Sequence, residues 1–313
     1  MTRCSRALFE KPFLIWPIVG VLAAFGFLDV RDAFAQSGEP VRYAYELTDS
    51  AAGQLTTDGN LAANACVVVG DPLTPDERRY AARHLALGKP QAVYERFREG
   101  YVLAEDARLK IPLWVQYELK REELDGPGSR TEDFRPDTSI PAGARAELAD
   151  YRSSGFDRGH MAPAADMKRS EKVMSESFLL SNMAPQVGIG MNRGLWADLE
   201  DAIRQWVFMR ETLTIISGPV FDASGTFVTY RVIGPNRVAV PTHFFKIVID
   251  DNNPAKPQIL AFLIPNQDLT GRHFSEFLTT VDAIERVTSL DFLSALPDAL
   301  EKLVEARKAP QVW

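Results

Sequence analysis

The chain is poor in cysteine. Only two cysteines, Cys4 and Cys66, occur in its 313 residues, and Cys4 lies in an N-terminal stretch that has the layout of a removable leader. Once that leader is cleaved, Cys66 remains alone and no internal disulfide can form. The remaining ~278 residues are long enough to bury one large apolar core, so the fold must rest on that core.

An excess of basic residues is also lacking. Lys and Arg number 35 against 42 Asp and Glu, which gives a net charge of −7. Between residues 127 and 170 we count seven of each sign. Non-specific nucleic-acid binders usually present a basic surface. Any polyanion should therefore be bound weakly and salt-sensitively, in a locally positive cleft.

The N-terminus carries a targeting pattern. Arg3, Arg6 and Lys11 precede an uncharged stretch over residues 12–28, and small residues at 33–35 offer a cleavage site before Gln36. This layout predicts a signal peptide over residues 1–35 and a secreted or periplasmic protein. The apolar run of about 17 residues barely spans a bilayer, so an uncleaved membrane anchor is the alternative.

One short segment concentrates chemically active residues. Asp157, Arg158 and His160 are interleaved with Gly155 and Gly159. Histidine, present only four times, has an ordinary pKa of ~6.5 and can take a proton from water at neutral pH. Arginine offers a fixed positive fork to an oxyanion, and glycine allows tight turning and close approach. The motif predicts a tight turn built around a phosphate-sized anion, with a surface Asp–Arg ion pair as the alternative.

A second block lies downstream. Apolar residues recur there at three- and four-residue steps: Trp196, Leu199, Ile203 and Trp206. The spacing predicts an amphipathic helix beginning near Asn192. Glu200 and Arg204 would then lie one turn apart on one side. Asn192 would lie near the N-terminus, where backbone N–H groups favour anions.

These blocks resemble the DNA/RNA non-specific endonuclease family of the ββα-metal superfamily. The resemblance covers residues 100 to 296 and is carried by Asp157–His160, 181–182, 184–186, Asn192, Trp196, Leu199 and Glu200, and also by Arg130, Phe134, 112–119 and 217–219. It implies an α+β fold, with a central, mainly antiparallel sheet flanked by helices. It also implies a hydrolase that cuts phosphodiester bonds of DNA and RNA without sequence preference.

The resemblance also implies roles for the base and the metal. His160 would be the general base that polarises a water for attack on phosphorus. Asn192 would hold a single Mg²⁺, with Mn²⁺ as the alternative ion, and Glu200 would hydrogen-bond the waters of that ion. Magnesium suits such a sparse ligand set because it keeps several waters.

Five further residues receive supporting roles from the resemblance. Arg158, Arg130 and Arg204 would hold the scissile phosphate and its growing negative charge. Asn182 would orient either the substrate or the His160 loop. Asp157 would support the loop, since a bare carboxylate beside a phosphodiester is repulsive.

Simpler interpretations exist for several of these residues. Asparagine is common at helix N-caps, so Asn192 could be a cap. Glu200 and Arg204 could form an ordinary pair four residues apart on a helix. Arg135 also lies near Phe134 and is the alternative to Arg130, which is preferred because the arginine precedes the aromatic residue in the family.

We expect residues 36–99 to form an N-terminal extension with a helical insertion, 100–296 the endonuclease domain, and 297–313 a C-terminal helix and tail. Strands are predicted at 100–104, 113–119, 213–217, 238–249 and 259–264, and helices from Pro75 and at 274–281 and 297–306. His84 and His273 have no chemical neighbours in the sequence and are expected at the surface.

Two functions of different class fit these observations. The first is a secreted, Mg²⁺-dependent endonuclease with DNA and RNA as partners. The second is a surface module with weakened turnover, or a phosphodiesterase for a smaller extracellular substrate. His160 and Asn192 favour the first, because a pure binder needs no base beside a metal ligand. Stable membrane association is expected only with an uncleaved leader, and the sequence specifies neither an inhibitor nor an oligomeric state.

Overall fold

The structure, a computed structural model, describes residues 41–44, 73–92, 94–221 and 227–313. All of them belong to the unit formed by residues 40–313, which is described by itself. The predicted leader and most of the predicted extension lie outside the described residues. None of the helices in the described part of the chain combines the length and apolarity that a bilayer span requires.

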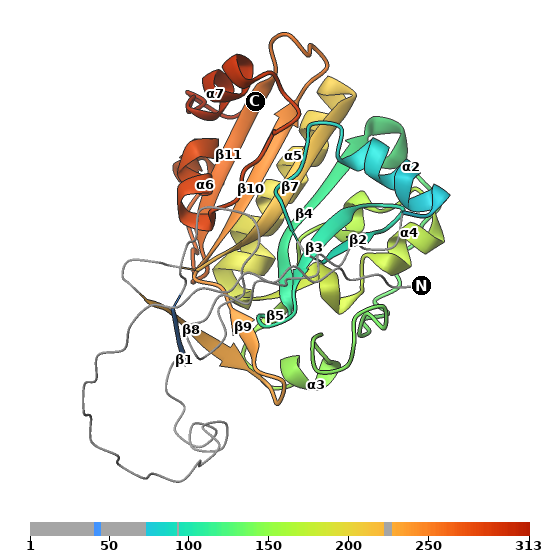
Figure 1. Cartoon of the computed structure of the whole chain (residues 1–313), viewed down its shortest axis with the longest axis vertical. Coiled ribbons are helices and arrows are strands. Elements are labelled where there is room, and N and C mark those ends of the chain that lie inside the picture. The colour runs from blue at the N-terminus through green and yellow to red at the C-terminus, as the bar shows by residue number, and fades with distance from the viewer. Residues whose placement is uncertain (1–40, 45–72, 93, 222–226) are drawn as a thin grey trace, which may run out of the picture. The chain divides into compact units, whose positions relative to one another are not determined.

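A seven-stranded antiparallel sheet forms the centre of this unit (Figure 1). Its strand order is β12-β11-β10-β7-β4-β3-β2. The strands are β2 (Glu95–Phe97), β3 (Val102–Asp106), β4 (Ile111–Lys120), β7 (Thr212–Val220), β10 (His243–Asp250), β11 (Gln258–Pro265) and β12 (Leu278–Thr279). The central strand β7 is buried along almost its whole length, as expected for a strand with both faces covered.

Two smaller antiparallel sheets accompany the central one. One contains β1 (Val41–Ala44), β8 (Phe227–Ile233) and β9 (Val238–Val240) in the order β1-β8-β9. The other pairs β5 (Asp157–His160) with β6 (Met183–Gln186), and it sets His160 opposite Met183. The second small sheet therefore carries the motif that the sequence singled out.

Helices cover both faces of the central sheet. On one face Leu199 and Ile203 of α5 (Trp196–Arg210) share a core with Ile215 of β7. On the other face α6 (Val281–Thr288) and α7 (Asp298–Glu305) pack against the next residue of β7, Ile216. Consecutive strand residues point to opposite faces, so neighbours in β7 belong to different cores. Helices α6 and α7 lie along β10 and β11 in Figure 1.

The remaining helical segments are shorter or lie at the edge of the sheet. They are α2 (Pro75–His84), α3 (Leu148–Tyr151) and α4 (Glu171–Glu176), with the turns η1 (Arg121–Glu123), η2 (Ala164–Asp166), η3 (Leu180–Asn182), η4 (Gly188–Leu195) and η5 (Phe274–Phe277). Helix α2 begins at Pro75, as predicted. Its N-cap Thr74 and Glu77 bond each other's backbone N–H groups.

Several predicted elements need correction. The segment 157–160 is strand β5 rather than a turn. The predicted strand 238–249 is two strands, β9 and β10, which pair with different partners, β8 and β7. The predicted helix 274–281 is η5 followed by β12, and helix α6 begins only at Val281, where the Thr280 hydroxyl caps it. The fold class, α+β with a mainly antiparallel central sheet, is confirmed.

Candidate active site

The β5–β6 pair positions His160, and the glycine beside it leaves room for a neighbouring side chain. A Cβ added to Gly159 would overlap the side chain of the buried Gln186 across the pair, which would have to move. Gly155, just before the strand, has a φ of +83°, a backbone conformation that side chains rarely adopt. These two glycines let the chain turn into β5 and pack closely against β6.

A cavity of about 700 Å³ opens beside this pair. Six of the predicted site residues line it: Arg130, Asp157, Arg158, His160, Asn192 and Glu200. They come from a long loop, from β5, from η4 and from α5, which are far apart in the sequence. The fold therefore brings a base, an amide, two carboxyl groups and two guanidinium groups to one concave surface.

His160 is enclosed by aromatic rings. Its imidazole lies 5.7 Å from the ring of Phe134 and 5.2 Å from that of Phe178, measured between centroids. Arg158 stacks over Phe134 at 4.0 Å and Arg130 over Phe178 at 5.2 Å. Burial, with a smaller contribution from these two cations, lowers the pKa of His160 to about 3. The imidazole is therefore neutral at physiological pH, the state that a general base requires.

Asn192 is oriented by Asp157. The Asn192 Nδ2 donates to Asp157 Oδ2 at 2.9 Å, which leaves the amide oxygen as the acceptor. Arg193 binds the same carboxylate with Nε at 2.7 Å and its terminal nitrogen at 2.9 Å. These hydrogen bonds, from Arg193 first and from Asn192, hold the pKa of Asp157 below its ordinary value. Asn192 lies in η4, while the N-cap position of α5 is Leu195, so Asn192 is not the cap of that helix.

Glu200 also faces the cavity, from the first turns of α5. Its Oε1 is buried and makes no hydrogen bond of normal geometry among the described residues, although the Trp196 side chain lies near enough to lower its pKa in part. Burial raises the pKa of Glu200 to about 7, and the nearby Lys246 opposes this shift. An unpartnered acidic oxygen at the wall of a polar cavity is suited to receive a donor from the contents of the cavity.

Lys246 was missed by the sequence reasoning. It is fully buried in β10, where Nζ donates to Ser217 Oγ at 2.9 Å and lies 4.3 Å from the centre of the Trp196 ring. Burial lowers its pKa. The available signal was a single lysine inside an otherwise apolar strand, because such a charge is rarely buried without a partner.

Arg204 does not line the cavity. Its guanidinium donates to Oδ1 of the buried Asp166 at 2.9 Å and also pairs with Asp201. Tyr117 donates its hydroxyl to the other oxygen of Asp166 at 2.7 Å. The structure therefore places Arg204 in a polar network on the inner side of α5. No ion pair joins it to Glu200 among the described residues.

Asn182 is fully buried behind the motif. Its Nδ2 donates to the carbonyls of Ala162 and Ser177, both at 2.8 Å, and its oxygen accepts the Ala162 N–H at 2.9 Å. The two contacts with Ala162 hold the backbone just after His160, and the third joins Asn182 to the end of α4. Of the two roles considered for Asn182, the geometry favours orientation of the His160 segment.

The structure separates the two candidate arginines near Phe134. Arg130 lines the cavity. Arg135 pairs with Asp133 at 2.6 Å, donates to the Ser175 carbonyl at 2.9 Å, and lies outside the lining. The geometry thus favours Arg130 as the residue that reaches the contents of the cavity.

The donor set at this site fits a hydrated divalent cation. The amide oxygen of Asn192 and the orphan carboxylate oxygen of Glu200 are hard ligands, which suit Mg²⁺, Ca²⁺ or Mn²⁺. With so few protein ligands along the cavity, most coordination positions are left to water and substrate, as Mg²⁺ prefers.

The fold and the site define a class of nuclease, and the chain belongs to the DNA/RNA non-specific endonuclease family, whose sequence profile matches residues 81–299. It is a hydrolase that acts as a non-specific endonuclease on DNA and RNA, in a family of divalent-metal-dependent enzymes.

Endonuclease G is among the relatives to which the chain is similar. The chain is 41% identical over 213 residues to endonuclease G of Homo sapiens, covering 66% of this chain and 71% of the relative. It is 30% identical to endonuclease G of Caenorhabditis elegans, covering 96% and 100%. A solved EndoG/EndoGI complex matches with a TM-score of 0.66 and 34% identity, covering 72% of this chain and 95% of the solved chain.

The relatives correct the predicted location. Both endonuclease G relatives are named as mitochondrial, which contradicts the expectation of a secreted or periplasmic protein. The prediction rested on basic residues and an apolar run near the N-terminus. Leaders with different destinations share the basic residues, so that part of the pattern does not separate them.

Proposed function

We propose that the cavity around His160 and Asn192 is the catalytic centre of an Mg²⁺-dependent endonuclease that cuts DNA and RNA. The observation that carries the proposal is the geometry of that cavity. A neutral, half-buried imidazole and an amide oxygen fixed by Asp157 line the same 700 Å³ space, with Arg130 and Arg158 beside them.

In the proposed reaction, His160 takes a proton from a water whose oxygen attacks phosphorus. The bond between phosphorus and the 3′ oxygen breaks, and that oxygen leaves with a proton from solvent. The products are a 5′-phosphate and a 3′-hydroxyl. The low pKa of His160 keeps the imidazole unprotonated, and phosphate binding beside it would offset part of the repulsion from the two arginines and so strengthen it as a base.

Arg130 and Arg158 would hold the phosphate oxygens. Each is stacked on a phenylalanine, which restricts its guanidinium before substrate arrives. Asn192 and, through water, Glu200 would hold the cation, which when bound neutralises negative charge on the phosphate. Asn182 and Asp157 would act by position, the first on the His160 segment and the second on Asn192.

The test is digestion of supercoiled plasmid and of RNA, with Mg²⁺ or with EDTA, by the wild type and two variants. His160→Ala should lose activity by about 10²- to 10⁴-fold and keep its metal affinity. Asn192→Ala should lose activity in a way that added Mg²⁺ or Mn²⁺ partly restores. Undiminished turnover in His160→Ala would remove the base from the mechanism. A small diester, bis(p-nitrophenyl) phosphate, cleaved faster than plasmid would favour the smaller substrate instead.

We also propose the extent and location of this enzyme. The catalytic domain would comprise residues 100–296, after an N-terminal extension and before the C-terminal helix and tail. The location named for the relatives makes the mitochondrion the proposed compartment. Imaging of a full-length fusion beside one that lacks residues 1–35 tests it, because loss of the leader should redistribute the protein.

A further inference from the structure

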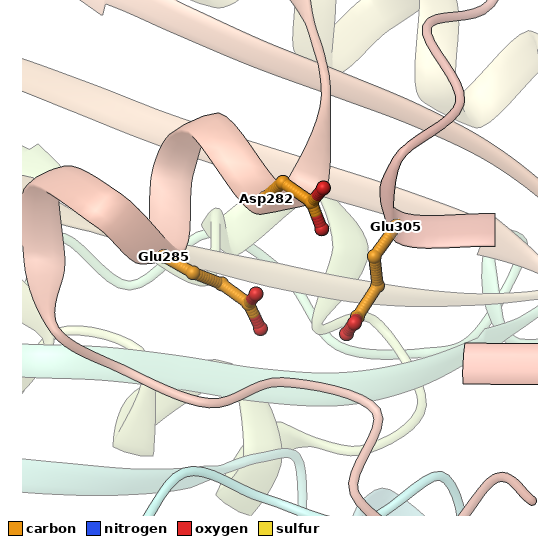
Figure 2. Close-up of side chains that lie close together, drawn as sticks. All are labelled: Asp282, Glu285 and Glu305. Atoms are coloured by element: carbon orange, nitrogen blue, oxygen red, sulfur yellow. The ribbon is translucent and has the colours of Figure 1, made fainter. Parts of the chain in front are cut away.

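Three carboxylates converge far from the catalytic cavity. Asp282 and Glu285 lie on α6, and Glu305 is the last residue of α7. Their side chains turn toward one space between the two helices (Figure 2). One oxygen from each of the three lies within 4.8 Å of the others. Because α6 and α7 pack on the other face of the sheet from α5, this cluster is separate from the site around His160.

Glu305 is the most buried member of the cluster. The residue is only 6% exposed, and among the described residues no N–H or O–H donates to its buried Oε1. Its carboxyl lies close enough to that of Glu285 for a hydrogen bond, but only if a proton lies between the two. A buried carboxylate oxygen that lacks a partner is costly, and such groups are rare in folded proteins. Its position at the C-terminus of α7 adds to the cost, since the helix dipole places negative charge there.

The charges around Glu305 do not relieve this cost. In the described ranges, no ion pair involves Asp282, Glu285 or Glu305. The Glu285 Oε1 instead accepts the Phe292 N–H at 2.8 Å, which fixes that carboxylate in place. Glu301 and Asp291 lie close enough to add further repulsion, and burial together with these neighbours raises the pKa of Glu305 to about 8. The cluster needs either a cation or a bound proton.

The geometry suits calcium. Ca²⁺ binds carboxylate oxygens at 2.3–2.6 Å in a flexible geometry, so three oxygens spread evenly around one ion lie about 4.0–4.5 Å apart. Mg²⁺ at 2.0–2.1 Å would draw them to about 3.5–3.6 Å and demands a stricter octahedral geometry. The three oxygens, all within 4.8 Å of one another, are compatible with the wider spacing around a single Ca²⁺.

We propose that Asp282, Glu285 and Glu305 form a Ca²⁺ site that joins α6 to α7. Ca²⁺ here neutralises the buried charge and fixes α6 and α7 over the core on their face of the sheet, which contains Ile284 and Val304. The site is structural and independent of the proposed catalytic metal.

The test measures thermal unfolding with CaCl₂ or with EDTA, in the Asn192→Ala background, which weakens cation binding in the catalytic cavity. At about a hundredfold excess over its dissociation constant, Ca²⁺ should raise the Tm by roughly 5–10 °C. Glu305→Gln in the same background should abolish this shift. Asp298→Asn is the matched control, because it removes an exposed carboxylate from the same helix and should leave the shift intact.

A second measurement protects the test against misfolding. Asp282→Asn, at a less buried position, should reduce the calcium stoichiometry measured by isothermal titration from one per chain to none detectable. Two results would overturn the proposal. One is a Tm of the Asn192→Ala protein that does not respond to CaCl₂, which indicates a proton shared between carboxyl groups. The other is an equal response in the Glu305→Gln protein.

Discussion

Asp157 offers a sharp test of how this site is built. Its carboxylate fixes the Asn192 amide and also pairs with the exposed Arg193. If the first contact matters for the metal, Asp157→Ala should free the Asn192 side chain to rotate and weaken metal binding. If only the surface ion pair matters, the same change should have little effect.

The magnitude follows from the contacts. A hydrogen bond to a charged group contributes about 1.5–3 kcal/mol, which corresponds to roughly 10- to 150-fold in an equilibrium constant. The Asn192–Asp157 bond is direct, at 2.9 Å, and lies beside the cavity. We therefore expect the Mg²⁺ concentration for half-maximal plasmid cleavage to rise by roughly 10- to 100-fold, as is typical of residues that orient metal ligands.

The matched control is Arg193→Ala. It removes the exposed partner of Asp157 and leaves the bond from Asn192 in place. Exposed ion pairs contribute at most about 1 kcal/mol. In this variant the Mg²⁺ concentration for half-maximal cleavage should therefore rise by less than about fivefold. The assay is the initial rate of plasmid nicking across a Mg²⁺ series. Equal losses in the two variants, or a deficit in Asp157→Ala that stays constant at all Mg²⁺ concentrations, would refute the positioning role.

Three further outcomes are expected. In metal-free protein, NMR should show that the imidazole of His160 remains neutral as the pH falls from 6.5 toward about 3. The unfolded chain binds more protons than the folded one over that pH range, so acid should destabilise the fold there. Titration of the imidazole near pH 6.5 would contradict its enclosed environment. Gly159→Ala should lower stability by about 1–3 kcal/mol in thermal or urea unfolding, with partial recovery on adding Gln186→Ala, because the new methyl group meets the Gln186 side chain. Glu200→Gln should reduce nuclease activity by roughly 10- to 100-fold, less than Asn192→Ala, and a larger loss would make Glu200 a direct ligand.

The motif residues could be located from sequence because their spacing is local. Asp157, Arg158 and His160 are neighbours in the chain, and the helical period after Asn192 placed Glu200 on α5. Apolar runs rich in β-branched and aromatic residues likewise predicted β4, β7 and β11, because a run of this length and composition between turns favours a strand over a helix. Local spacing and the family resemblance therefore identified the motif residues without tertiary information, but not the position of Arg204 or the presence of Lys246.

Other features could not be inferred from local pattern. His84 seemed a surface residue, yet it is buried, with Nδ1 accepting the Glu118 N–H at 3.1 Å and Nε2 within 3.0 Å of the Glu99 carbonyl oxygen. Residues 274–281 have a helical pattern, but β12 adds to the edge of β11 and interrupts it. In both places a distant segment supplies the partner, which a local window does not contain.

The sequence by itself determined the family, the identity of the chemical groups and the class of fold, because these depend on residue type and short spacing. The tertiary structure alone decided which groups meet. It set Asp157 against Asn192, committed Arg204 to Asp166, buried Lys246 behind Glu200 and gathered three carboxylates between α6 and α7. The physical reason is that charge pairing and burial depend on distance in space, and chain order fixes that distance only over a few residues.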